Sequence, residues 1–95
     1  MTMKITKADS LELIINELKR AEELHPRWPE DILHAVAIVN EEAGEVTKAA
    51  SDFVYNNGPL YAVQKELVQT AAMCVRMLLH IGKYYQQKLK RKNHE

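Results

Sequence analysis

Glycine and proline are scarce in this sequence, and their positions divide it into three segments. The chain has 95 residues, of which only three are glycine and three are proline. Proline lacks the backbone donor and disfavours helix in the residue before it, so Pro26 ends the first segment. The turn sequence NNGP at residues 56–59 ends the second segment. Apolar residues recur at helical spacing within each segment and no stretch predicts a strand, so we expect an all-α fold.

The predicted helices have approximate bounds that follow from these breaks. The first covers residues 10–25, and Asp9 is its predicted cap because Asp9 and Glu12 have capping-box spacing. The second has Pro29 in its first turn and ends near Tyr55. The third extends from Leu60 to about Lys90. We therefore expect one domain over residues 1–95, with flexible ends at 1–8 and 88–95. Its predicted architecture is an antiparallel bundle of three main helices, with or without a short extra helix.

The third predicted helix is apolar over more than half of its circumference. At about 100° per residue, one side carries Leu67, Ala71, Cys74, Val75, Leu78 and Ile81. Met73 and Met77 widen this surface on one edge, and Ala72 and Leu79 widen it on the other. A helix of this kind is buried on several sides, which two neighbouring helices in one subunit do not provide. The sequence thus predicts that dimerisation, or assembly into a dimer of dimers, completes the bundle.

Composition excludes several classes of protein. Thirteen basic and thirteen acidic residues give a formal net charge of zero, so no overall basic character favours nucleic acid as a partner. A single cysteine, Cys74, excludes an internal disulfide framework and fits a reducing, cytoplasmic location. No signal peptide is visible, and no apolar run reaches the roughly 20 residues that cross a bilayer. We expect a small soluble protein without a membrane partner.

Three glutamates are crowded into the sequence EEAGE of the second predicted helix. The predicted core face contains Ile32, Val36, Val39, Ala43, Val46 and Ala50. Glu42 lies only about 80° from the centre of that face, Glu45 lies further round, and Glu41 lies almost opposite. Like charges that are partly desolvated are unfavourable without a cation. Gly44, within the same sequence, indicates either close approach by another group or simple tolerance.

The third predicted helix provides a second polar pair, Glu66 and Gln69, at the edge of its apolar surface. Residues three apart meet on a helix surface, so each helix offers two oxygen-bearing side chains side by side. Mg²⁺ prefers oxygen ligands in an octahedral shell. The two pairs together predict a metal site formed by Glu42, Glu45, Glu66 and Gln69.

These motifs resemble those of the MazG-like, all-α nucleoside triphosphate pyrophosphohydrolases. EEAGE followed by KELVQ is similar to the paired E-E-x-x-E and E-x-x-D signature of that family, and HPRWPEDILHAVAIV and TAAMCVRML resemble small bacterial and phage members. The resemblance covers roughly residues 25–79. It implies cleavage of a nucleoside triphosphate, with deoxynucleotides as the first candidates, to the monophosphate and pyrophosphate.

The resemblance also implies roles for individual residues. Glu42, Glu45 and Glu66 would be ligands of Mg²⁺, or of Mn²⁺ in its place, and Gln69 stands where the family has an aspartate. Glu41 would orient or deprotonate water as the catalytic base; alternatively it is a solvated acid. The family assembles as dimers or dimers of dimers, which agrees with the prediction from the apolar surface.

Several other residues have two interpretations. Lys48, Arg76 and Lys83 are candidates to bind phosphates, although Lys48 and Arg76 are equally suited to ordinary salt bridges. Trp28, the single tryptophan, either stacks on a nucleobase or packs in the core. Asp31 and His34 have the i,i+3 spacing of one of the two Glu-x-x-His motifs of a di-iron site, but a second such motif is missing. Because Gln69 contributes less charge than a carboxylate, a non-catalytic helical dimer that binds nucleotide or a protein partner is the alternative function.

Overall fold

The computed structural model describes residues 4–93, and this part of the chain folds into four α-helices. They are α1 (Lys7–Leu24), α2 (Ile32–Tyr55), α3 (Leu60–Leu79) and α4 (Ile81–Asn93). Residues 4–93 contain no strand, which confirms the all-α prediction. None of these helices combines the length and the apolar character that crossing a membrane requires.

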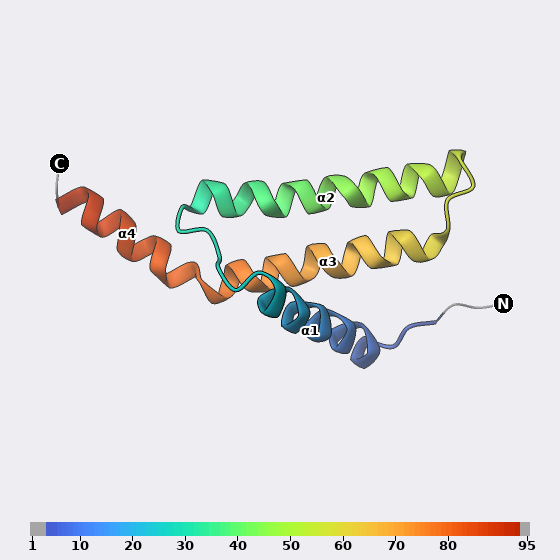
Figure 1. The fold of residues 1–95 in the computed structure, drawn as a ribbon, viewed down its shortest axis with the longest axis horizontal. Helices are drawn as coiled ribbons and strands as arrows, with labels where there is room; N and C mark the ends of the chain where they lie inside the picture. Colours follow the sequence, from blue (N-terminus) through green and yellow to red (C-terminus); the bar gives the residue numbers. More distant parts are fainter. Residues whose placement is uncertain (1–3, 94–95) are drawn as a thin grey trace.

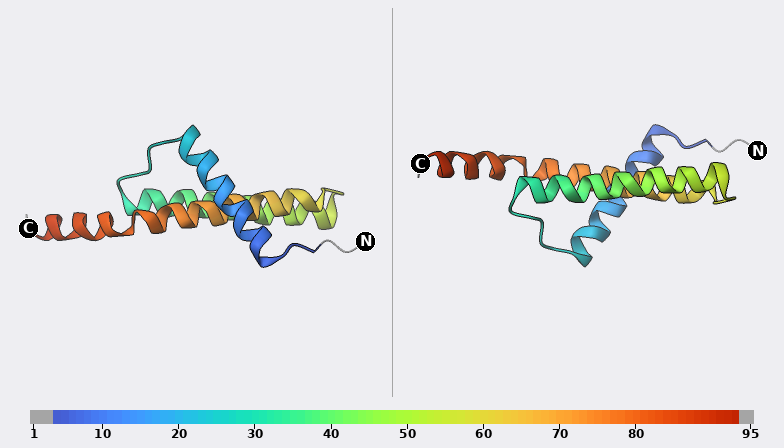
Figure 2. Two further views of the ribbon diagram at one scale, coloured as in Figure 1. Left: turned by 90° about the horizontal axis from the view of Figure 1, so that it is seen from below. Right: turned by 90° about the horizontal axis from the view of Figure 1, so that it is seen from above.

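Helix α3 is the centre of the fold. Figure 1 shows α2 and α3 side by side and antiparallel, with α4 extending away from the end of α3. The two views in Figure 2 show that α1 crosses this pair obliquely, and it makes its contacts with α3. The structure is therefore an antiparallel pair with a third helix across it, and α4 is the short extra helix that the sequence allowed.

The first two helices begin at positions that differ from the predicted ones, as their N-cap residues show. Thr6, and not Asp9, is the N-cap of α1, because its side chain accepts a hydrogen bond of 3.0 Å from the Asp9 backbone N–H. The Asp31 carboxylate likewise accepts a 2.9 Å bond from the Leu33 N–H and begins α2. Pro29 consequently lies in the connection and not in the first turn of a helix. A side-chain oxygen at the N-cap satisfies an otherwise unpaired donor, which fixes where each helix begins.

The predicted long third helix is interrupted at His80. The His80 ring nitrogen Nδ1 lies 2.8 Å from the Arg76 carbonyl oxygen, which would otherwise accept the backbone N–H of His80. That N–H donates instead to the Met77 carbonyl at 3.0 Å. A side chain inserted into the helical hydrogen-bond ladder is a recognised cause of a kink. Gly82, a residue type that weakens a helix, lies two residues further on, in the first turn of α4.

Helix α2 ends where the sequence predicts. The backbone N–H groups of Asn56 and Gly58 both donate to the Asp52 carbonyl, and Asn57 between them has a positive φ of 59°. A Cβ on Gly58 would lie 2.9 Å from the Asp52 Cβ, so only glycine fits this turn without displacing its neighbour. The NNGP sequence thus forms the tight turn between α2 and the antiparallel α3.

The predicted core faces are only partly buried in the single chain: Val39, Val46 and Ala50 of the predicted α2 face are half-buried. The helix surfaces that meet inside carry mainly small, aromatic and polar residues: Ala21, Trp28, Ala35, Ala49, Ala72, Tyr84 and Arg76 are the buried ones. Ile32, Val36 and Ala43 of the predicted α2 face are exposed. On α3, Leu67 and Leu78 are 53% and 65% exposed, and Cys74 is also exposed. Helix α3 turns Glu66 toward α2, α1 covers part of its apolar side, and the remainder of that side, with Cys74 and Leu78, is exposed.

Candidate functional site

The glutamates of EEAGE occupy different environments on α2. Glu42 is half-buried where α2 faces α3, whereas Glu41 and Glu45 are exposed. The inward position of Glu42 predicted from helical geometry is therefore confirmed. Gly44 has open space around it, since a Cβ built there would meet no atom of residues 4–93 within 4 Å apart from its immediate helical surroundings. Close approach within the chain does not explain this glycine.

Glu42 lies among other carboxylates. Burial raises the pKa of Glu42 above its ordinary value of 4.5, and the charges of Glu66, Glu41, Glu45 and Glu17 raise it further, in that order. Sequence reasoning anticipated the first three neighbours. It missed Glu17, which α1 contributes because that helix crosses α3 at this level. The ion pair between Glu17 and Arg20, with a nitrogen–oxygen distance of 2.8 Å, provides the adjacent positive charge.

The four predicted metal ligands come from the two antiparallel helices. Glu66 and Gln69 of α3 are half-buried, as Glu42 is, and Glu45 lies one turn further along α2. All four offer oxygen, which is the donor chemistry that Mg²⁺ prefers. In the side-chain positions of residues 4–93, no three Asp, Glu, His or Cys side chains are close enough to hold a metal ion. The donor set fits Mg²⁺ chemically, and binding requires these side chains to turn toward one another.

Lys48 lies beside this acidic group. It lines a small concavity of about 200 Å³ together with Glu45 and Glu66, next to the turn that contains Gly58. Lys48 therefore shares a concavity with two of the predicted metal ligands, Glu45 and Glu66.

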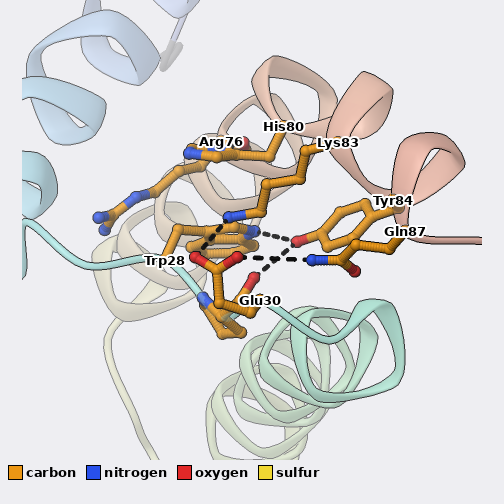
Figure 3. Close-up of polar contacts among 8 residues, drawn as sticks. Trp28, Glu30, Arg76, His80, Lys83, Tyr84 and Gln87 are labelled. Atoms are coloured by element: carbon orange, nitrogen blue, oxygen red, sulfur yellow. Dashed lines mark hydrogen bonds and ion pairs between the residues drawn. The ribbon is translucent and has the colours of Figure 1, made fainter. Parts of the chain in front are cut away.

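Trp28 belongs to a packed cluster at the α3–α4 junction. Its ring is 7% exposed and packs against Ala35 and Tyr84. The indole Nε1 donates a 2.7 Å hydrogen bond to the Tyr84 hydroxyl, which donates in turn to the Pro29 carbonyl at 3.0 Å. Figure 3 shows Tyr84 at the nitrogen edge of the indole and the His80 and Arg76 side chains lying over the ring. The packing interpretation of Trp28 matches this structure, and nucleobase stacking on it stays a prediction.

Arg76 is buried in the same cluster. Only 3% of the residue is exposed, and its guanidinium carbon lies 5.2 Å from the centroid of the Trp28 ring. Its terminal nitrogens donate to the backbone carbonyls of Ala21, at 3.4 Å, and His25. These bonds hold the end of α1 against α3. The predicted phosphate contact of Arg76 is untested, and its first function in this structure is to hold these elements together.

Lys83 is directed to another part of the surface. Its ammonium nitrogen lies 3.1 Å from the Glu30 carboxylate, and Gln87 donates to the same carboxylate at 3.4 Å. Figure 3 shows this group on the α4 side of Trp28. Lys83 does not line the cavity that contains Glu42. The structure therefore does not bring Lys83 to the acidic site, although the sequence predicted Lys83 on the same helix as Glu66 and Gln69.

A cavity of about 270 Å³ connects the two clusters. Glu42 and Gln69 lie in its wall together with Arg76 and Trp28, and Ile38 and Met73 provide apolar surface between them. Arg27, in the loop after α1, also lines this cavity. A ligand in it would have carboxylate and amide oxygens at one part of its surface and an aromatic ring with a buried cation at another.

Comparisons with models of known protein families, with curated proteins and with solved structures found no match to this chain.

Proposed function

We propose that this chain is a Mg²⁺-dependent nucleoside triphosphate pyrophosphohydrolase, which converts a deoxynucleoside triphosphate to the monophosphate and pyrophosphate. One observation carries the proposal: the half-buried Glu42 lies among Glu66, Glu41 and Glu45, and their charges and burial raise its pKa. Such a group of like charges is unfavourable by itself and becomes favourable when a cation binds. The resemblance of EEAGE and KELVQ to the paired acidic motifs of the MazG-like enzymes suggests the reaction.

The residues divide the work of the proposed reaction. Glu42, Glu45, Glu66 and Gln69 would hold Mg²⁺ or Mn²⁺, which when bound neutralises phosphate charge and polarises a phosphoryl oxygen. Glu41 is exposed beside this group and would orient and deprotonate the attacking water. Lys48 would contact a phosphate oxygen as a point charge. Positioning and electrostatic stabilisation dominate phosphoryl chemistry of this kind, so the protein needs no covalent nucleophile.

The proposed enzyme is a homodimer or a dimer of dimers. The single chain exposes 7500 Å², whereas a folded monomer of its mass of 10.9 kDa exposes about 5,600 Å². Its radius of gyration is 16.5 Å, against about 12 Å for a compact domain of this length. The difference of about 1,900 Å² exceeds the roughly 800 Å² that one partner buries in a standard interface. The outward apolar side of α3 supplies the surface that a second copy would cover.

A cytoplasmic location belongs to the same proposal. Cys74 is a free and exposed thiol in this structure, which suits a reducing compartment. The intended substrates, free nucleotides, are found in that compartment.

The experiment that tests this function is a product analysis with the full chain. Canonical and modified deoxynucleoside triphosphates are incubated with and without Mg²⁺, and the products are separated by ion-exchange chromatography. Monophosphate and pyrophosphate in equal amounts are expected, and their formation should stop in Glu42→Ala and Glu66→Ala. Glu22→Ala, which removes an exposed acid of α1, is the matched control. Absence of turnover with every nucleotide, in a protein that unfolds cooperatively, would favour the non-catalytic binding protein instead.

A further inference from the structure

We propose that the cleft between α1 and α3 binds the β- and γ-phosphates of the substrate, with Arg20 as the principal contact and Lys65 as a second one. This inference rests on the proposed pyrophosphohydrolase function and adds to it the residues that hold the leaving pyrophosphate. Its structural basis is an open cleft that adjoins the acidic site, a cation on each of the two helices that form it, and a carboxylate that fixes one of these cations.

The cleft lies where α1 crosses α3 (Figure 2). Its volume is about 510 Å³, within the roughly 300–1,000 Å³ of typical ligand sites. Three of its residues, Glu17, Arg20 and Gln69, also line the cavity that contains Glu42. The cleft therefore adjoins the acidic site, and a phosphate chain that begins near Gln69 can extend into it past Arg20.

Arg20 is held in a defined geometry and remains accessible. Its Nε and Nη2 groups donate to the two carboxylate oxygens of Glu17, both at 2.8 Å. The Glu17 side chain is 15% exposed, whereas the Arg20 side chain is 54% exposed. Bidentate pairing of this kind fixes the orientation of the guanidinium plane. The third nitrogen, Nη1, has no hydrogen-bond partner within residues 4–93, so its two N–H donors are available to an oxygen anion.

The cleft has the charge and the donors that a polyphosphate requires. Its wall contains one acid, Glu17, and two cations, Arg20 and Lys65. Lys65 is exposed and forms no ion pair in the part of the chain that the structure describes. The side-chain amides of Asn16 and Gln64 add neutral donors to the same wall. A forked guanidinium together with an ammonium group is a combination that favours phosphate oxygens.

Arg20 and Lys48 lie at different ends of the acidic group. Lys48 shares its concavity with Glu45 and Glu66, whereas Arg20 lines the cavity that contains Glu42. A triphosphate placed along the acidic group would thus meet a cation at each end. The β- and γ-phosphates carry most of the negative charge of a triphosphate, and the Arg20 end opens into a cleft with a second cation. This difference assigns the pyrophosphate part to the Arg20 end.

Binding of inorganic pyrophosphate tests this inference separately from catalysis. The full-length protein in saturating Mg²⁺ is titrated with pyrophosphate by isothermal titration calorimetry. Arg20→Ala should raise Kd by about tenfold or more, because hydrogen bonds between charged groups are strong. Arg20→Lys keeps the charge but loses the fork, so its Kd should lie between those of Arg20→Ala and the wild type. Lys65→Ala should raise Kd by a smaller factor than Arg20→Ala, because an ammonium group acts as a point charge.

The matched control is Lys19→Ala, which removes the same charge from an exposed neighbouring position of α1. Its Kd should stay within about twofold of the wild-type value, because screening weakens the effect of a distant exposed charge. The Arg20 variants should fold, since an exposed ion pair contributes little to stability, and circular dichroism checks this. An unchanged Kd in Arg20→Ala, an equal loss in Lys19→Ala, or no binding of pyrophosphate to the wild type would overturn the proposal.

Glu17 acts through Arg20 as a positioning residue, and the sign of its effect tests this role. By charge alone, removal of an acid from the cleft would tighten the binding of an anion. Glu17→Gln should instead weaken pyrophosphate binding by about threefold, because Arg20 loses its preorganised orientation. In the Arg20→Ala background the same substitution should cause no further weakening. Tighter binding by the single variant Glu17→Gln would reject the positioning role.

The two proposals of this article fail in different ways. Pyrophosphate binding that depends on Arg20, without hydrolysis of any nucleotide, would reject the catalytic proposal and leave the assignment of the cleft standing. Hydrolysis to the monophosphate and pyrophosphate, with pyrophosphate binding that does not depend on Arg20, would do the reverse.

Discussion

Replacement of Glu42 by glutamine is expected to stabilise the metal-free protein and to abolish its stabilisation by Mg²⁺. Glutamine has nearly the same shape as glutamate and keeps a side-chain oxygen, but it carries no charge. Four carboxylates raise the pKa of Glu42, namely those of Glu66, Glu41, Glu45 and Glu17. The substitution therefore removes the repulsion between Glu42 and four neighbouring carboxylates. It also removes one carboxylate from the proposed Mg²⁺ ligands.

The magnitude follows from these four neighbours. A like-charged pair three residues apart on a helix, as Glu42 and Glu45 form, destabilises by about 0.2–0.5 kcal/mol. The other three carboxylates act in the same direction, so removal of the Glu42 charge should raise the unfolding free energy by at least about that amount. For a domain of fewer than 100 residues, each kcal/mol raises Tm by about 4–8 °C. In the wild type, Mg²⁺ at a hundred times its Kd would add about 2.7 kcal/mol. Glu42→Gln should lose most of that second increment.

The assay is thermal unfolding followed by circular dichroism at 222 nm, a far-ultraviolet wavelength characteristic of helix. Wild type, Glu42→Gln and the exposed control Glu22→Gln are compared at equal protein concentration, because Tm of an oligomer depends on it. Samples contain either Mg²⁺ or EDTA, and NaCl equalises the ionic strength so that general screening is the same. The control should shift Tm by little and keep the response to Mg²⁺.

The pH dependence has a definite sign. Because the folded state raises the pKa of Glu42, the folded protein binds the proton more tightly than the unfolded chain does. The contribution of this group to stability is fully present below its ordinary value of 4.5 and is lost as the pH rises through the folded pKa. The advantage of Glu42→Gln should accordingly vanish below pH 4.5 and be complete at neutral pH. A variant that is less stable than wild type in EDTA at neutral pH, or that keeps the full Mg²⁺ response, would refute the reasoning.

Three further substitutions test other parts of the structure. Tyr84→Phe removes the hydroxyl that accepts a hydrogen bond from the Trp28 indole and donates one to the Pro29 carbonyl. Urea unfolding should therefore show an unfolding free energy that is lower by about 1–3 kcal/mol. The control Tyr85→Phe, at a tyrosine that is 61% exposed, should change this free energy by no more than about 0.5 kcal/mol. Leu78→Glu places a charge at a position that is 65% exposed in the single chain and would be covered in the proposed oligomer. Light scattering at micromolar concentration should show a lower mass than that of the wild-type oligomer. An unchanged mass would mean that Leu78 is not in the interface between copies. Gln69→Asp adds a carboxylate to the acidic site and should lower the Mg²⁺ concentration for half-maximal thermal stabilisation several-fold, whereas an increase would place residue 69 outside the metal shell.

Local sequence signals were sufficient to predict most of the helix bounds, but not which face of each helix is buried. The NNGP turn and the helical spacing predicted the end of α2 and the start of α3, which the structure confirms. The break at His80 was missed because it depends on a side chain that bonds the Arg76 carbonyl, and the spacing of apolar residues continues across it. Within one chain the predicted faces are only partly covered, because small residues such as Ala35 and Ala72 fill the contact between α2 and α3 while larger apolar side chains such as Leu67 and Leu78 stay exposed.

The acidic site was predictable where it depends on positions along one helix and not where it depends on how separate helices pack. Helical geometry places Glu42 toward the interior, and the spacing of Glu66 and Gln69 at the edge of the apolar surface of the third helix identified their side chains as counterparts of Glu42. Glu17 was not predictable, because only the oblique crossing of α1 brings it near Glu42. The burial of Arg76 under the end of α1 likewise depends on contacts between residues more than 50 positions apart.

In the proposed function, the acidic group of α2 and α3 directs hydrolysis between the α- and β-phosphates. The most direct measurement is ³¹P NMR of each canonical deoxynucleoside triphosphate incubated with the protein and Mg²⁺. Signals of the monophosphate and of pyrophosphate should grow together while the triphosphate signals decline, and neither should grow with Glu66→Ala. Growth of orthophosphate and nucleoside diphosphate as the primary products, or an unchanged spectrum, would contradict the account.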